Sequence, residues 1–90
     1  IIADLNGEAA ERVALEVRAR GAESLAVKVN VGDADAVDGM VDAVVGRYGR
    51  VDALINNAAI FSTLKMRPFE AIPLDEWDQV LRVNITGCFY

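Results

Sequence analysis

The sequence predicts an α/β fold in which a parallel sheet is covered by helices on both faces. Short apolar runs of strand length alternate with longer segments whose apolar residues recur with helical spacing, in the order β, α, β, α, β, α. The runs are almost continuously apolar, which is typical of strands buried on both faces and favours a parallel sheet. A polar signal follows each run, so the strand ends are candidate ligand-binding positions.

Three apolar runs are the predicted strands: residues 1–3 (IIA), 24–30 (SLAVKVN) and 51–55 (VDALI). Helix start and stop signals frame the segments between and after them. Asn6 is expected to cap a first helix that ends at Gly21, and Asp33 a second that Gly49 closes. A third helix is expected to begin near Asp75.

Composition limits the classes of protein to consider. The chain has 90 residues, of which 53% are hydrophobic and 26% charged, as in one small globular domain. Its net charge of −5 and scattered basic residues make a nucleic-acid partner unexpected. No apolar run reaches the roughly 20 residues of a membrane helix. The single cysteine, Cys88, cannot form an internal disulfide and suits the cytoplasm. We assign no metal-binding residues.

The stretch LINNAAIF places two asparagines, Asn56 and Asn57, between apolar flanks at the end of the third predicted strand. Asp4 and Asn30 hold the same position after the first and second strands. Ordinary turn chemistry would explain Asp4 or Asn30 alone. Because parallel strands bring their carboxyl ends to one edge of a sheet, the three signals together favour a shared binding edge.

Four short motifs occur in order along the chain: ADLN, VNVGD, INNAA and VNITG. Together they closely resemble the short-chain dehydrogenase/reductase family, over nearly all 90 residues. The chain departs from the family pattern at Ala59, where glycine is usual. The resemblance implies a Rossmann-like doubly wound parallel sheet, of which this chain would supply three strands and three helices. We expect residues 1–90 to be part of a single dinucleotide-binding domain, truncated at both ends.

The resemblance implies cofactor-binding residues at the three strand ends: Asp4, Leu5, Asn30, Val31, Asn57, Ala58 and Ala59. Asp4 matches the family's cofactor-selecting residue, whose carboxylate accepts hydrogen bonds from the adenosine ribose. A 2′-phosphate about 4 Å away would face a like charge, an opposition of roughly 4 kcal/mol at an effective dielectric near 20. NAD is therefore expected over NADP. The alternative is that Asp4 helps Asn6 to cap the first helix, and both roles could coexist.

Asn84 lies on the apolar stripe of the third predicted helix, where an amide is unexpected. An unpaired buried amide costs about 1 to 3 kcal/mol, so a partner is expected. Periodicity alone allows a polar helix-packing contact. By resemblance, Asn84 matches the asparagine of the family's catalytic tetrad, which orders a water that links the catalytic lysine to solvent.

The implied activity is that of an NAD(P)-dependent oxidoreductase that moves hydride between a nicotinamide cofactor and a secondary alcohol or ketone. Its third helix resembles one that pairs between subunits, which implies a homodimer or homotetramer. The family's glycine-rich turn would precede Ile1, and its serine and Tyr-x-x-x-Lys pair would follow Tyr90, so this chain alone is expected to be inactive. The alternatives are a non-catalytic dinucleotide sensor or scaffold, and a methyltransferase, which would have no need of the double asparagine.

In the family's sheet a further strand separates the first and third strands of this segment. Within this chain the first two strands can therefore pair, whereas residues 51–55 have no neighbour. Unpaired buried strand edges are costly. We therefore expect that the 90-residue chain does not fold alone.

Overall fold

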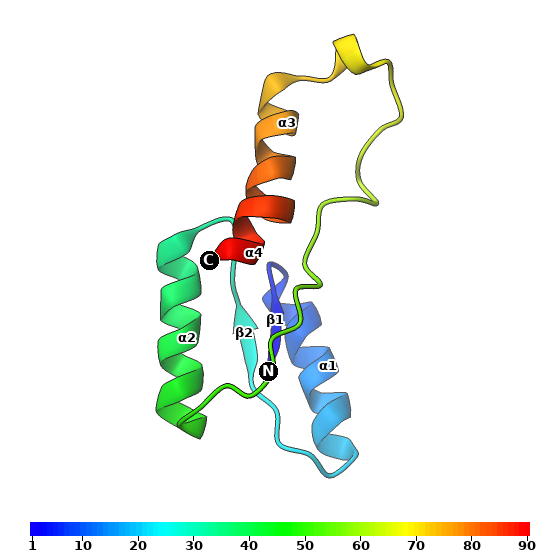
Figure 1. Cartoon of the computed structure of the whole chain (residues 1–90). Coiled ribbons are helices and arrows are strands. Elements are labelled where there is room, and N and C mark those ends of the chain that lie inside the picture. The colour runs from blue at the N-terminus through cyan, green and yellow to red at the C-terminus, as the bar shows by residue number, and fades with distance from the viewer.

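The computed structural model, which describes residues 1–90, contains a two-stranded parallel sheet with helices around it (Figure 1). The elements are β1 (Ile2–Asp4), α1 (Gly7–Ala19), β2 (Ala26–Lys28), α2 (Ala34–Tyr48), the 3₁₀ turn η1 (Phe69–Ala71), α3 (Leu74–Leu81), the π-helical segment η2 (Arg82–Thr86) and α4 (Gly87–Phe89). The α/β class and the parallel pairing predicted from the sequence are confirmed.

The strands β1 and β2 run parallel, with Ile2 opposite Ala26 and Asp4 opposite Lys28. The ladder continues past the strand ends, because the N–H of Val29 donates to the carbonyl of Asp4 at 3.0 Å. The carboxyl ends of the two strands therefore lie side by side. In Figure 1 this end of the sheet faces α4.

The predicted helix boundaries follow from local chemistry, and most are confirmed. The side chain of Asn6 accepts from the N–H of Ala9 at 3.1 Å, and that of Asp33 from the N–H of Ala36 at 3.2 Å. Each satisfies one of the donors left over at a helix start. Gly21 (φ 90°) follows α1, and Gly49 (φ 78°) ends α2 in the left-handed conformation that glycine adopts without strain.

The core lies where α1 and α2 flank the strand pair (Figure 1). Its buried apolar residues are Ala10, Ala14, Val29, Val37 and Val44. They are small, and 7 of the 90 residues are buried, so the core is small for a chain of this length.

None of the helices is long and apolar enough to cross a membrane.

The third predicted strand is absent, so the prediction of three strands within the chain is wrong. Residues 51–59 form an exposed connection, in which Leu54 and Ile55 are 74% and 85% exposed. A strand exists only when a neighbour meets its backbone groups, and the sheet contains only β1 and β2. β1 has the predicted length and is shifted by one residue, whereas β2 is shorter than the predicted run of residues 24–30, so Asn30 lies beyond β2 rather than within it.

The third predicted helix begins at Leu74 after Pro73, and the backbone remains helical to Phe89 through α3, η2 and α4. Within η2 the helix widens to a π-helical turn, in which the N–H of Gly87 donates to the carbonyl of Arg82, five residues earlier. Single π-helical turns of this kind are frequent at functional sites. This turn contains Asn84.

The molecule is elongated, with extents of 49 × 25 × 19 Å. Its radius of gyration is 15.3 Å, against about 12 Å for a compact domain of this length. Large apolar side chains are exposed in the second half of the chain, including Phe61, Met66, Phe69 and Phe89. Extensive exposed apolar surface normally packs against other protein.

Candidate functional site

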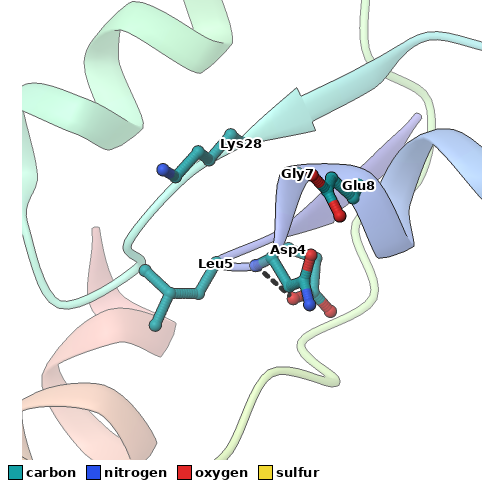
Figure 2. Close-up of a pocket in the computed structure, with 6 residues that line it drawn as sticks. Asp4, Leu5, Gly7, Glu8 and Lys28 are labelled. Atoms are coloured by element: carbon teal, nitrogen blue, oxygen red, sulfur yellow. Dashed lines mark hydrogen bonds between the residues drawn. The ribbon is translucent and has the colours of Figure 1, made fainter.

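An open hollow lies at the carboxyl end of β1, where the chain turns into α1 (Figure 2). Its volume is about 780 Å³, and it is lined by Asp4, Leu5, Asn6, Gly7, Glu8 and Lys28. The hollow thus contains Asp4 and Leu5, two of the residues predicted to bind the cofactor. It adjoins the start of a helix, where backbone N–H groups favour negative charge.

The carboxylate of Asp4 is held by the turn that it helps to form. Its Oδ1 accepts from the N–H of Asn6 at 2.8 Å, and Asn6 in turn caps α1. The second oxygen, Oδ2, remains able to accept hydrogen bonds from a ligand. The turn role and a ligand role are therefore compatible at Asp4, as the sequence suggested.

Lys28 is a lining residue that the sequence reasoning missed. It lies at the end of β2 across from Gly7 (Figure 2), and a Cβ added at Gly7 would lie 3.1 Å from the Cβ of Lys28. Two signals could have revealed it. Lys28 is directly opposite Asp4 in the parallel register, and it shares a strand face with Asn30, two residues later.

Asn30 stabilises the loop that leaves β2. Its Oδ1 accepts from the N–H of Gly32 at 3.0 Å, and its carbonyl accepts from the N–H of Asp33 at 3.0 Å. The amide nitrogen Nδ2 is left to donate to a ligand. Val31, half-buried, follows at the tip of this loop. Since Val29 pairs with Asp4, the structure brings the loop and Asp4 to one edge.

The third predicted group, Asn57 with Ala58 and Ala59, lies in the exposed connection after α2. The N–H of Asn57 donates to the carbonyl of Ile55 at 3.0 Å, a local turn. This group does not line the hollow, and its link to the rest of the candidate site is the next residue, Ile60, whose backbone bonds Asn84. The strand that was expected to hold it is absent.

Asn84 binds the backbone of Ile60 with both ends of its amide. Oδ1 accepts from the N–H of Ile60 at 2.8 Å, and Nδ2 donates to the carbonyl of Ile60 at 3.0 Å. The expectation that this amide has a partner is confirmed. One further lone pair on Oδ1 and one N–H on Nδ2 remain, so the side chain can still bind a water or a ligand.

The side chain of Asn84 thus bonds the backbone of Ile60 in the way that a neighbouring strand would. It satisfies a peptide donor and acceptor that no neighbouring strand meets. The contact joins two segments 24 residues apart in sequence. A helical asparagine and the residues just after a predicted strand therefore meet in one place.

The family model described as "short chain dehydrogenase" matches residues 1–90, and the chain belongs to this family. It is 40% identical over 87 residues to the short chain dehydrogenase/reductase dpchG of Colletotrichum higginsianum, covering 97% of this chain and 32% of the relative. It is 43% identical over 83 residues to the 3-oxoacyl-[acyl-carrier-protein] reductase FabG of Staphylococcus aureus, covering 91% and 32%.

A solved structure shares the arrangement of elements. The crystal structure of NAD⁺-bound xylitol dehydrogenase matches with a TM-score of 0.88 and 37% identity, covering 97% of this chain and 33% of that one. The predicted Rossmann-like fold is therefore confirmed. The chain spans about a third of the length of each of these relatives.

Proposed function

We propose that this chain is one part of a longer dinucleotide-binding domain, and that the full-length protein is an oxidoreductase that prefers NAD to NADP. When bound, the cofactor supplies hydride exchange with a secondary alcohol or ketone. Membership of the short chain dehydrogenase family supports the reaction class. The preference rests on one observation, the carboxylate of Asp4 in the hollow at the end of β1.

Asp4 in the hollow, together with Asn30 and Val31 in the loop after β2, fits the adenosine part of a dinucleotide. Asp4 offers a free carboxylate oxygen that can accept from two neighbouring ribose hydroxyls, since Oδ1 alone is engaged by the turn. Asn30 offers an amide N–H to a ring nitrogen, and Val31 an apolar side chain to a ring face. Both lie at the same sheet edge as Asp4.

Charge in the hollow supports NAD over NADP. Asp4 and Glu8 are acidic, and Lys28 is the one basic lining residue. No arginine occurs in residues 5–7 to pair with a 2′-phosphate. The xylitol dehydrogenase of similar structure was crystallised with NAD⁺, which agrees with this proposal.

Asn84 is proposed as the asparagine of the family's catalytic tetrad. Its bonds to Ile60 fix the side chain, and its remaining donor and acceptor can hold a water in place. The water would pass protons between solvent and the acid/base residues of the full-length protein.

The exposed face of α3, with Leu74, Trp77 and Leu81, is proposed to pair with a second subunit in a homodimer or homotetramer.

The Asp4→Ala substitution tests the cofactor preference. We expect it to weaken NAD binding by the full-length protein about tenfold to a hundredfold, because hydrogen bonds to a charged group contribute about 1.5 to 3 kcal/mol. NADP binding should change little or improve, since a like charge is removed. Titration of both cofactors by fluorescence or calorimetry gives the two Kd values.

Glu8→Ala is the matched control, because it removes the same charge from the same hollow one helical turn away from the strand end. It should leave the ratio of the two Kd values nearly unchanged. Equal losses for NAD and NADP in Asp4→Ala would contradict the ribose role. Binding of NAD without turnover of any alcohol or ketone would favour the sensor alternative.

A further inference from the structure

The helical stretch from α3 to α4 lies against the loop after β2, and glycines lie on both sides of the contact. A Cβ added at Gly87 would lie 2.9 Å from the carbonyl oxygen of Val31 and 3.0 Å from its Cγ2. A Cβ added at Gly32 would lie 3.1 Å from the Cγ of Arg82. In Figure 1, α4 lies at the end of the strand pair, consistent with this contact.

Gly87 is required by close approach rather than by backbone conformation. Its φ of −64° and ψ of −22° are ordinary helical values. Alanine is favoured over glycine by about 1 kcal/mol in a helix interior, so propensity alone argues against glycine here. A Cβ at 2.9 Å from a backbone oxygen cannot be relieved by rotating a side chain. Either the Val31 loop or the helix would have to move.

The helix and the loop have separate anchors. Three residues before Gly87, Asn84 holds the helix to Ile60 through two hydrogen bonds. The loop is held by two hydrogen bonds of its own, both to Asn30. These are local, and Val31 lies at the tip between them. We expect a side chain at position 87 to displace Val31, because Val31 is the residue that the added Cβ would meet.

We propose that Gly87 is a positioning residue, whose missing side chain lets the Val31 loop take up the position in which it contacts the adenine of the cofactor. This inference rests on the proposed function. It assigns the glycine a role in affinity for the adenine half of the dinucleotide. The same helical stretch contains Asn84, so it contacts the Val31 loop through Gly87 and the Ile60 segment through Asn84.

The Gly87→Ala substitution in the full-length protein tests the inference with AMP and nicotinamide mononucleotide as probes. The Kd for AMP is expected to rise about tenfold, equivalent to about 1.4 kcal/mol. The Kd for nicotinamide mononucleotide should stay within about twofold. The KM for NAD should rise by a similar factor to the Kd for AMP, while kcat at saturating NAD is retained. General loss of structure would not separate the two halves in this way.

Gly46→Ala is the matched control. Gly46 also lies inside a helix, and a Cβ added there would have no neighbour within 4 Å. The same holds for Gly39 in α2. Both control variants should bind AMP as the unsubstituted protein does.

Hydrogen exchange separates this inference from the proposed function, because it needs no ligand. The amides of Gly32 and Asp33 both donate to Asn30 and should exchange faster in Gly87→Ala than in Gly46→Ala. If the unsubstituted protein bound no dinucleotide, the proposed function would fail, and the exchange result would still test the contact. Unchanged exchange, or an unchanged Kd for AMP in a protein that binds NAD, would overturn the role of Gly87.

Gly32→Ala tests the contact from the loop side if Gly87→Ala does not fold. Its Cβ would lie 3.1 Å from the Cγ of Arg82, a flexible side chain, and 3.3 Å from the Oδ1 of Asn30, so a milder rise in the Kd for AMP of about threefold is expected. Adding Arg82→Ala should reverse part of this rise by making room on the helix side, while the contact with Asn30 remains. A Kd for AMP that does not rise in Gly32→Ala would overturn the inference.

Discussion

The Asn84→Ala substitution in the full-length protein is expected to lower turnover about a hundredfold, within the range typical of lost proton-transfer groups. Affinity for NAD should change less, because Asp4, Asn30 and Val31 lie at the ends of β1 and β2, and only the group from Asn57 to Ala59 adjoins the Ile60 contact that is lost. Steady-state kinetics over a range of NAD concentrations separate kcat from KM. Unchanged turnover would make Asn84 a packing residue only.

The same substitution should also destabilise the protein, by about 2 kcal/mol, because the N–H and carbonyl of Ile60 would lose their partners in a half-buried place. Urea unfolding measures this part of the effect. Gln79→Ala is the control, since Gln79 is an exposed residue of α3 in the same helical stretch. It should leave both turnover and stability nearly unchanged.

The second large effect concerns the chain by itself. A purified peptide of residues 1–90 is expected to show no cooperative unfolding transition, because 7 of its residues are buried and the segment 51–59 has no strand partner. Circular dichroism during a urea titration should show a gradual loss of helix, as expected for weakly coupled elements.

The full-length protein is the reference and should give a sigmoidal transition under the same conditions. A sigmoidal curve for the peptide, coincident by circular dichroism and tryptophan fluorescence from Trp77, would show that the 90-residue chain folds alone. The unpaired segment 51–59 would then not prevent the chain from folding.

Local features of the fold could be predicted from the sequence because their causes are local. The caps at Asn6 and Asp33 and the left-handed Gly49 depend on a few neighbouring residues. Residues 51–55 have the composition of a strand, but strand formation depends on a partner elsewhere in the polypeptide. The apolar pattern of this segment is therefore typical of a strand, although the segment forms no strand in this chain.

The site was predictable to the same extent. A parallel sheet places the ends of successive strands at one edge, so the proximity of Asp4 and Asn30 could be expected. The need of Asn84 for a partner could also be inferred, but its partner could not. Ile60 contributes only backbone groups, and these carry no sequence signal. The π-helical turn around Asn84 is likewise invisible in the apolar spacing.

The turn at the end of β1 links cofactor choice to helix initiation. One oxygen of Asp4 accepts from the N–H of Asn6, the residue that caps α1, and Asp4 also lines the hollow. Any redesign toward a phosphorylated cofactor that simply deletes the carboxylate would also loosen the first turn of the helix. Asparagine or serine at this position would discard the charge and keep an acceptor for that N–H, so selectivity could be altered without sacrificing the local architecture.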